Sequence, residues 1–257
     1  MSRFLRGTKP PLVAMIQFHT PDEALKTMKR ALGEGAEAFG IQMCKFYPEY
    51  RTPEVYRKLF AAAEGLPIYV TNYRGHENTG KTDETLAQEL LELADCGATL
   101  CDMMGDFYDP QPGELTTDER AVEKQMRLIE EIHHHGAEVL MSSHVKKYLP
   151  EERVVAILQA HERRGADIAK LVVGDTTMEE LTENLRLCAA LREKLGIPYL
   201  FLSGKQGGVM RRVGPMLGVC CWLCRCGDEE LETKKQPLLK KMKAIRDNFE
   251  FDWEEEI

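Results

Sequence analysis

The chain has 257 residues, of which 43% are hydrophobic and 30% are charged, and its formal net charge is −8. An acidic chain without a basic stripe is not expected to bind nucleic acid, because phosphate recognition needs clustered cations. The apolar run within residues 1–18 is too short and too polar for a signal peptide or a membrane span. We therefore expect a cytoplasmic protein that makes no membrane contact and whose eight cysteines are free thiols.

Strand-length apolar runs and helical segments alternate eight times along the chain. The runs occupy residues 12–18, 38–46, 67–73, 99–106, 138–144, 168–174, 198–204 and 219–225. Helical spacing of apolar residues predicts helices over 21–34, 53–64, 83–96, 117–135, 150–164, 177–195, 209–217 and 235–249. Continuous apolar runs are typical of parallel strands that are covered by helices. Eight such units predict an α/β protein with a closed (β/α)8 TIM barrel.

Short sequence signals support these boundaries. Capping patterns such as "TPEV" at 52–55 and "TDET" at 82–85 precede helices, and Gly35, Gly65, Gly97, Gly136, Gly165 and Gly196 suit the left-handed residue that follows a helix. A Gly-x-Gly-x-x-Gly motif does not follow the first run, which argues against a dinucleotide fold. We expect residues 1–257 to form a single barrel domain, with a leader at 1–11 and an acidic tail at 250–257.

Polar residues cluster where the predicted strands end. In (β/α)8 barrels the chemistry occurs at the carboxyl ends of the strands, so these residues are the candidates for a site. They are Gln17, His19, Gln42, Cys44, Asn72, Arg74, Asp102, Asp106, Ser142, Ser143, His144, Lys170, Ser203 and Lys205.

Lys170 is unusual because it lies inside an apolar strand. Alternation places Lys170, Val172 and Gly174 on one face, and if that face lines the barrel interior the amine is buried. One interpretation is a lysine that reaches the rim or pairs with an acid such as Asp102. The other is a lysine that forms a Schiff base with a ketone, with His144 on the adjacent strand as the general base.

Four stretches give the chain a family resemblance. "MSSH" ends the fifth strand, "GADIAK" enters the sixth, "SGKQGGVMRR" follows the seventh, and a late glutamine occurs in "KKQP". Together they resemble type I 3-dehydroquinate dehydratases, which are metal-free and cofactor-free barrel enzymes. The resemblance implies that Lys170 forms an imine with the substrate ketone and that His144 takes and returns protons.

The same resemblance implies further site residues. Arg212, with Arg211 one position away, matches the arginine that binds the substrate carboxylate, and Gln236 matches a glutamine that assists it. Arg74 matches an arginine that follows the third strand, and Ser203 is expected to contact the substrate from the end of the seventh. Glu77, or its neighbour Asn78, is expected to orient His144.

The second strand departs from the family pattern. The family carries a glutamate and, two residues later, an arginine that contact the substrate hydroxyls, whereas this chain has Gln42 and Cys44. The family's serine in the closing loop has Thr233 as its nearest counterpart. We predict a Schiff-base lyase that removes water from 3-dehydroquinate or a related cyclic β-hydroxy keto acid, acting as a homodimer. A Schiff-base aldolase and a keto-acid-binding barrel without turnover are the alternatives.

Two further clusters are predicted to have structural roles. Consecutive helical residues point about 100° apart, so the three histidines at 133–135 cannot all face one metal ion. The cysteine-rich run at 220–226 lacks a second ligand pair at zinc-site spacing, so core thiols are expected there. We predict no metal site.

Overall fold

The computed structural model describes residues 2–7, 9–204, 208–227 and 235–249. In these residues eight strands alternate with eight α-helices. In chain order they are β1 Leu12–Ile16, α1 Pro21–Gly33, β2 Ala38–Gln42, α2 Pro53–Ala61, β3 Ile68–Thr71, α3 Asp83–Asp95, β4 Leu100–Met104, α4 Glu119–His134, β5 Glu138–His144, α5 Glu151–Arg163, β6 Ile168–Val173, α6 Met178–Ala190, β7 Tyr199–Ser203, α7 Met210–Val213, β8 Trp222–Cys224 and α8 Leu239–Asp247. The predicted alternation and the predicted fold class are confirmed.

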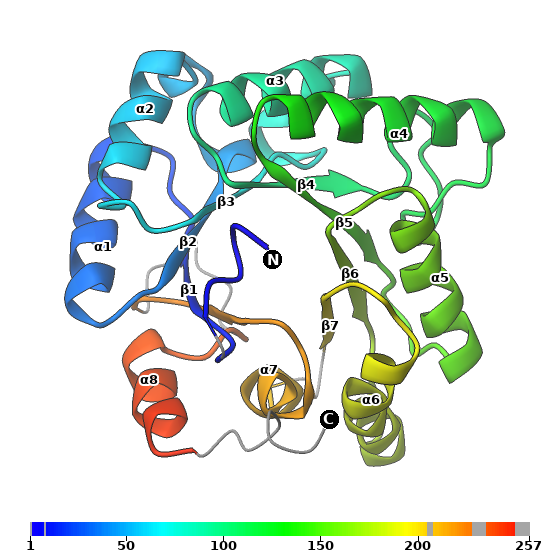
Figure 1. Cartoon of the computed structure of the whole chain (residues 1–257). Helices are drawn as coiled ribbons and strands as arrows, with labels where there is room; N and C mark the ends of the chain where they lie inside the picture. Colours follow the sequence, from blue (N-terminus) through cyan, green and yellow to red (C-terminus); the bar gives the residue numbers. More distant parts are fainter. Residues whose placement is uncertain (1, 8, 205–207, 228–234, 250–257) are drawn as a thin grey trace.

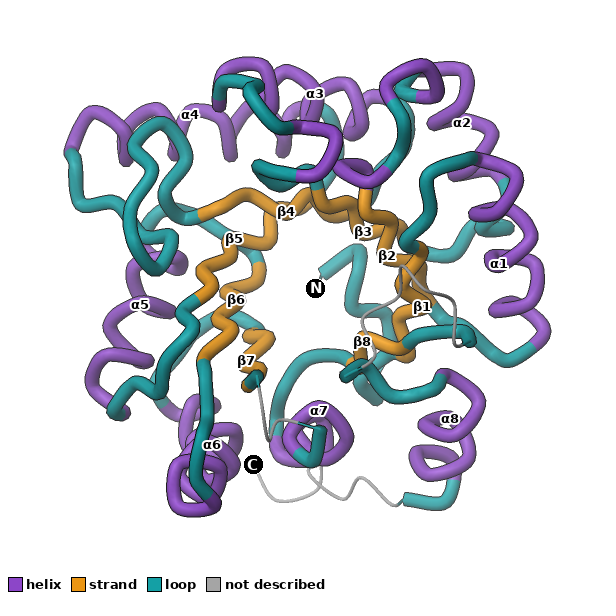
Figure 2. The backbone as a smooth tube through the Cα atoms, turned by 180° about the vertical axis from the view of Figure 1, so that it is seen from behind, coloured by secondary structure: helices purple, strands orange, loops and turns teal. Residues whose placement is uncertain are grey.

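The strands form one parallel sheet that curls into a barrel. The order is β7-β6-β5-β4-β3-β2-β1-β8, so the last strand returns to pair with the first. Among the described residues no ladder joins β7 to β8, and a single backbone hydrogen bond, from Cys220 N to Tyr199 O at 2.9 Å, links the two segments. Figures 1 and 2 show the helices as an outer ring around the strands.

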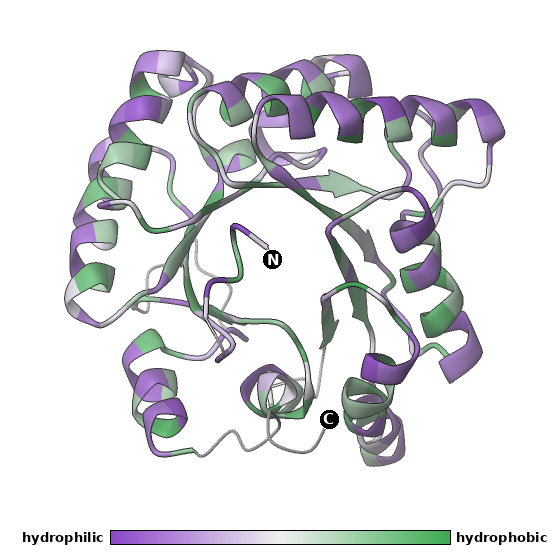
Figure 3. Ribbon diagram, in the orientation of Figure 1, coloured by the Kyte–Doolittle hydropathy of each residue, from purple (hydrophilic) through white to green (hydrophobic). Residues whose placement is uncertain are grey.

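The helices bury one face against the sheet. In α4 the buried residues Ala121, Gln125, Leu128, Ile129 and Ile132 recur at three- and four-residue spacing, which places them on one side of the helix. Figure 3 shows the same division, with apolar colour along the strands and polar colour on much of the helical surface. This packing explains why the strands are continuously apolar, since their outer side chains meet helices and their inner ones meet each other.

The N-terminal segment packs into the base of the barrel. Phe4 is 2% exposed, and its ring contacts the Tyr69 ring edge-on at a centroid distance of 6.2 Å. The Glu138 carboxylate accepts hydrogen bonds from Ser2 Oγ at 2.8 Å and from the backbone N–H groups of residues 3 and 4. Figure 1 shows this segment running into the ring of strands. Part of the predicted leader is therefore a packed element, because it covers apolar interior that would otherwise meet water.

A close approach inside the barrel requires a glycine in β2. A Cβ built on Gly40 would lie 2.3 Å from Met15 Sδ and 3.1 Å from the Tyr69 ring. The absent side chain thus makes room for two large residues of neighbouring strands.

Several boundaries differ from the predictions. The second apolar run leaves the sheet after Gln42 and becomes a 3-10 helix, η1, at Met43–Lys45. The predicted helix over 209–217 divides into α7 and a 3-10 helix, η5, at Gly214–Leu217, and the predicted strand over 219–225 shortens to β8. Five of the six post-helix glycines have positive φ, but Gly196 does not, and its N–H instead donates to the Glu162 carboxylate at 2.8 Å. The predicted acidic tail at 250–257 lies outside the described residues.

Candidate active site

A cavity of about 230 Å³ opens at the carboxyl ends of the strands. Its lining combines four apolar residues with a larger number of polar side chains that converge from several strands. The lining residues are Met15, Gln42, Tyr69, Thr71, Tyr73, His144, Lys170, Val172, Leu202, Arg211, Leu223 and Gln236. A cavity in which polar groups converge beside apolar side chains is a candidate small-molecule site.

Lys170 projects from β6 into this cavity and is 5% exposed. Its Nζ lies 2.5 Å from Tyr73 Oη, 3.1 Å from Tyr69 Oη and 3.0 Å from Asp102 Oδ2. Strand alternation explains the placement, since Lys170 shares its face with cavity-lining Val172. A buried ammonium is tolerated only with a counter-charge and hydrogen-bond acceptors, and both are present.

Asp102 is the counter-charge. It lies in β4, is fully buried, and accepts hydrogen bonds from both tyrosine hydroxyls and, at 2.6 Å, from Ser142 Oγ. Burial alone would raise the pKa of Asp102, but the Lys170 ammonium and these hydrogen bonds outweigh it and hold the pKa below its ordinary value. The carboxylate therefore stays ionised beside the lysine.

His144, the last residue of β5, is held by a carboxylate from a distant loop. Its Nδ1 lies 2.6 Å from Glu114 Oε2. Because a carboxylate accepts, this contact favours the tautomer with a proton on Nδ1, which leaves Nε2 able to take a proton. The expected partner, Glu77, lies on the 3-10 helix η3 at His76–Asn78, so Glu114 replaces Glu77 as the residue that orients His144.

The backbone at Glu114 is also constrained. Its φ of 54° is left-handed, which is uncommon for a residue with a side chain. Ser143 Oγ donates to its carbonyl oxygen at 2.5 Å, and a Cβ on Gly105 would lie 2.8 Å from that same oxygen. No periodicity identifies Glu114. The signal in the sequence is the long connection between β4 and α4, since long loops in compact domains are often functional.

Asn78 and Arg51 support the cavity wall from behind. Asn78 Nδ2 donates to the carbonyl oxygen of Tyr73 at 2.8 Å and to Asn72 Oδ1 at 2.8 Å. Arg51 donates to Asn78 Oδ1 at 2.5 Å. Asn78, the alternative to Glu77 in the prediction, therefore fixes the backbone of Tyr73.

Arg74 does not line the cavity. Its guanidinium forms ion pairs with Asp83 at 2.5 Å and Asp106 at 2.8 Å. With both carboxylates bound, this arginine ties the β3 loop to the start of α3 and to the loop after β4. Its expected role in substrate binding is not supported by this placement.

Of the two adjacent arginines, Arg211 faces the cavity. It lines the cavity from α7, and its buried Nε has no hydrogen-bond partner. Burial lowers the pKa of Arg211 while Asp175 acts in the opposite direction, yet a guanidinium remains charged in proteins. Arg212 is exposed and donates to the carbonyl oxygen of Gly208. The structure therefore places Arg211 where Arg212 was expected.

The predicted amide residues do reach the cavity. Gln42, the last residue of β2, and Gln236 both line it. Gln17 Nε2 donates to Gln236 Oε1 at 3.5 Å, and Lys45 Nζ donates to Gln17 Oε1 at 2.9 Å. Lys45, one residue beyond Cys44, is thus connected to the cavity by hydrogen bonds through Gln17 and Gln236. The sequence pattern did not identify this lysine.

Ser203 and Cys44 lie away from the lining. Ser203 is fully buried and donates to Asp175 Oδ2 at 2.7 Å. Cys44 is buried in η1, and burial raises the pKa of its thiol. Neither side chain is among those that line the cavity.

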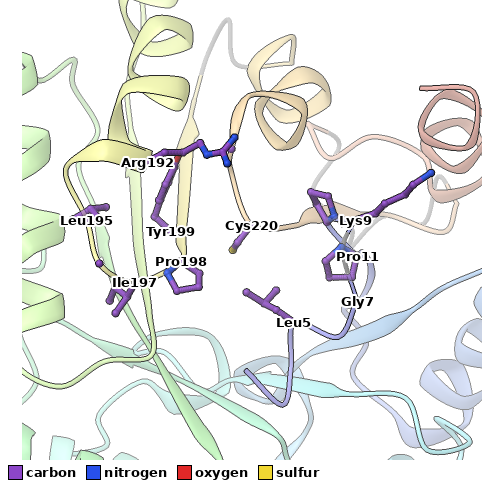
Figure 4. Close-up of a pocket in the computed structure, with 13 residues that line it drawn as sticks. Leu5, Gly7, Lys9, Pro11, Arg192, Leu195, Ile197, Pro198, Tyr199 and Cys220 are labelled. Carbon is purple, nitrogen blue, oxygen red and sulfur yellow. The ribbon is translucent and has the colours of Figure 1, made fainter. Parts of the chain in front are cut away.

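A second cavity, of about 360 Å³, lies at the other end of the barrel. Figure 4 shows Lys9 and Pro11 of the N-terminal segment on one side and Arg192, Tyr199 and Cys220 on the other. The cavity follows the seam between β7 and β8. Among the described residues its lining has no carboxylate or histidine, in contrast to the surroundings of Lys170.

The histidines at 133–135 and the cysteines of the run at 220–226 do not form metal sites among the described residues. His133, His134 and His135 bond to Asp167, the Glu130 carbonyl oxygen and Asp95 respectively, so the three rings diverge. All eight cysteines are free thiols. Within the described ranges no three histidine, cysteine or acidic side chains gather as a metal site, and no helix is long and apolar enough to cross a bilayer.

Comparison with solved structures shows the fold. The 3-dehydroquinate dehydratase from Geobacillus kaustophilus HTA426 superposes with a TM-score of 0.80 at 17% identity, over 95% of this chain and 92% of that one. The type I 3-dehydroquinate dehydratase from Clostridium difficile, solved with covalently modified comenic acid, gives a TM-score of 0.79 at 15% identity, over 95% and 93%.

Sequence comparison gives the family. A 3-dehydroquinate dehydratase from Aromatoleum aromaticum (strain DSM 19018 / LMG 30748 / EbN1) is 26% identical over 173 residues, which are 65% of this chain and 62% of that protein. The chain thus spans less than two thirds of that relative's length. A model of the type I 3-dehydroquinase family matches residues 12–245. The chain belongs to the type I 3-dehydroquinase family.

Proposed function

We propose that this protein is a Schiff-base lyase that removes water from 3-dehydroquinate or a related cyclic β-hydroxy keto acid. The observation that carries the proposal is the pairing of two groups at one cavity. Lys170 supplies an amine on β6, and His144, fixed by Glu114, supplies a base on β5. Amine and base are the two groups that imine-based elimination requires.

The proposed reaction has three parts. Lys170 Nζ adds to the substrate ketone and, with loss of water, forms an iminium that carries the same single charge as the ammonium it replaces. Asp102, 3.0 Å from Nζ, therefore stabilises the iminium as it stabilises the ammonium. His144 then removes the proton alpha to the iminium carbon, the enamine expels the β-hydroxyl with a proton from His144, and water releases the enone.

Arg211 is proposed to bind the substrate carboxylate. It is the arginine that lines the cavity, and its unpaired buried Nε is a donor without an acceptor. A carboxylate would satisfy it by a charge-assisted hydrogen bond, which is stronger than a neutral one. Gln236, on the same cavity, is proposed to assist.

A second candidate is a barrel that binds a keto acid as a sensor without turning it over. The observation in its favour is the reduced charge of the cavity, since Gln42 is neutral and Arg74 is paired with two carboxylates. A Schiff-base aldolase would use the same enamine to break a carbon–carbon bond. These candidates differ in product, not in the first covalent step.

The test is covalent trapping. Incubation with 3-dehydroquinate and borohydride, followed by intact-mass and peptide measurement, should give one reduced adduct on Lys170. Lys170→Met should abolish it, while Lys147→Met, which changes an exposed lysine beyond β5, should not. An adduct that persists in Lys170→Met, or the absence of any adduct in the natural sequence, rejects the proposal.

The role of His144 is tested separately. His144→Ala should still form the adduct but should not produce the enone, because nucleophile and base are different residues. Enone formation without an adduct in any variant would reject the imine route. An adduct in the natural sequence without enone would favour the sensor, and carbon–carbon cleavage products would favour the aldolase.

We also propose a cytoplasmic homodimer. The free state of all eight cysteines supports a reducing compartment. Sedimentation analysis of the purified protein tests the dimer, and a monomer at micromolar concentration would reject it.

A further inference from the structure

Tyr73 is the least buried of the groups that contact the reactive nitrogen. Lys170 Nζ lies within 3.1 Å of Tyr73 Oη, Tyr69 Oη and Asp102 Oδ2. Both tyrosines line the cavity, but Tyr69 is 1% exposed and Asp102 is 2% exposed, whereas Tyr73 is half-buried. Of the two tyrosines that contact Nζ, Tyr73 is therefore the more accessible from the cavity.

The hydrogen bonds give the Tyr73 hydroxyl a defined direction. It accepts from Lys170 Nζ at 2.5 Å and donates its own proton to Asp102 Oδ2. The same Asp102 oxygen also accepts hydrogen bonds from Tyr69 Oη and Lys170 Nζ, and the other oxygen accepts one from Ser142 Oγ. Both oxygens of Asp102 thus have hydrogen-bond donors. Asp102 itself is not among the residues that line the cavity.

Imine formation from an ammonium requires protons to move but requires none from outside. The ammonium carries three protons and the iminium carries one, while the ketone oxygen leaves as water with two. The overall charge is unchanged, so the two protons on the departing water are those that the nitrogen loses. The site needs a group that carries protons from nitrogen to the substrate oxygen.

We propose that Tyr73 is a catalytic residue that carries these protons between Lys170 and the substrate carbonyl oxygen, both in imine formation and in the final hydrolysis. This inference rests on the proposed Schiff-base function. Lys170 first gives one proton to Asp102, and the freed lone pair forms the new bond between nitrogen and carbon. A proton then passes from the nitrogen through Tyr73 to the alkoxide, which gives the neutral carbinolamine.

Water leaves in the next step. The proton held by Asp102 passes through Tyr73 to the carbinolamine hydroxyl, and the bond between carbon and oxygen breaks. The nitrogen lone pair forms the iminium, and both Asp102 and Tyr73 return to their starting states. Hydrolysis of the final iminium runs through the same transfers in reverse.

Two features of the surroundings suit this role. Burial and the Asp102 carboxylate raise the pKa of Tyr73 well above its ordinary value, so the phenol keeps a proton to donate. The Tyr73 ring also meets the His144 ring edge-on, with centroids 5.5 Å apart, and Nδ1 of His144 is bound by Glu114. His144 is thereby left for the proton alpha to the iminium and for the β-hydroxyl, while Tyr73 serves the lysine nitrogen and the carbonyl oxygen.

The experiment compares Tyr73→Phe with Tyr69→Phe, each in the His144→Ala background, so that elimination does not consume the imine. Both substitutions remove one hydroxyl that contacts Lys170 and Asp102, but only the first changes the tyrosine that is partly exposed. The rate of borohydride-trapped adduct with 3-dehydroquinate should fall by at least about a hundredfold in Tyr73→Phe, the low side of the range for proton-transfer groups. The loss in Tyr69→Phe should be smaller.

A second readout does not depend on the substrate. Formaldehyde with cyanoborohydride methylates lysines through the same iminium, and peptide mass spectrometry reports the rate at Lys170 alone. This rate should also fall in Tyr73→Phe, and added imidazole buffer should partly restore it, because a small acid–base molecule can replace a lost proton carrier. Thermal melting by circular dichroism checks that the variants are folded.

The outcomes separate the two claims. If 3-dehydroquinate labels no lysine in the natural sequence, the proposed function fails, and the formaldehyde rates still decide the role of Tyr73. If Tyr73→Phe matches its parent in both rates, the inference is overturned. It is also overturned if both phenylalanine variants lose rate equally without rescue by buffer, since that result means the hydroxyls only hold Lys170 in place.

Discussion

The cost of burying a lysine charge explains most of the polar residues around Lys170. An ammonium removed from water must recover its solvation from the protein, and here one carboxylate and two hydroxyls provide it. Asp102 is held in turn by Ser142, its diagonal neighbour on β5. Lys170 and the groups that surround it therefore come from four adjacent strands, β3 to β6, and from the residues that follow β3.

At the anion end of the cavity, Arg211 is predicted to control affinity. Arg211→Gln should raise the KM for 3-dehydroquinate about tenfold to a hundredfold, because a hydrogen bond to a charged group contributes about 1.5–3 kcal/mol. Arg212→Gln removes an exposed charge that is bound to a backbone carbonyl, and its KM should change by less than about threefold. Steady-state enone formation measures both. A larger rise in KM for Arg212→Gln than for Arg211→Gln would show that Arg212 binds the substrate carboxylate.

His161 on α5 is predicted to make stability depend on pH. It is fully buried, and burial together with Arg164 lowers its pKa from 6.5 to about 3. Between these values the unfolded chain binds a proton that the folded chain does not. The contribution of neutral His161 to the free energy of unfolding is therefore complete above pH 6.5 and is lost as the pH drops toward 3.

The measurement is urea unfolding between pH 6.5 and about pH 4.5. His161 contributes a slope of at most about 1.4 kcal/mol per pH unit, and His161→Gln should reduce the slope by that amount. His134→Gln changes an exposed ring and serves as the control. An unchanged slope in His161→Gln would show that other groups cause the acid sensitivity.

At the scale of elements, the N-terminal segment stabilises the barrel from below. Phe4→Ala should lower the free energy of unfolding by about 3–5 kcal/mol, the usual cost of removing a buried phenylalanine side chain. Urea denaturation measures the change. Arg6→Ala, at an exposed position of the same segment, should change it by less than about 0.5 kcal/mol. Equal effects of the two substitutions would mean that the segment does not pack as an element in solution.

Contact with Tyr69 connects this segment to the site. The Phe4 ring packs against the Tyr69 ring, and Tyr69 Oη contacts Lys170 Nζ at 3.1 Å. Tyr69 thus links the N-terminal segment at the base of the barrel to the cavity around Lys170. Because protein interiors are closely packed, removing the Phe4 ring should also shift the Tyr69 ring that it contacts.

At the scale of the whole molecule, the barrel is closed unequally. Seven pairs of strands form ladders, whereas β7 and the segment before β8 share the one hydrogen bond between Cys220 and Tyr199. The contacts along this seam are therefore the weakest constraint on barrel opening among the described strands.

Hydrogen exchange should report this difference. We expect the amides of residues 219–224 to exchange faster than those of β5 and β6, because backbone groups with fewer ladder partners open at lower free energy. Deuterium uptake followed by peptide mass spectrometry measures both regions in one sample. Equal protection of the two regions would indicate that side-chain packing closes the seam as firmly as a ladder.

The sequence by itself determined the barrel and singled out the two residues that are proposed to react. Parallel strands covered by helices must be apolar on both faces, so eight apolar runs separated by amphipathic helices are visible without coordinates. The same rule makes a lysine inside a strand conspicuous. It also places Lys170 and His144 on adjacent strands, and in the structure both side chains line one cavity.

Only the tertiary structure decided which partners these residues have. Tyr73 lies 97 residues from Lys170 in the chain and Glu114 lies 30 from His144. Periodicity fixes the face of a side chain but not the path of a loop or the stagger between strands, so the sequence predicts Glu77 where the structure has Glu114. Arg211 and Arg212 are adjacent on a four-residue helix, and only the packing of that helix turns one into the cavity. Arg74 satisfied the motif, but two nearby carboxylates bind it outside the cavity.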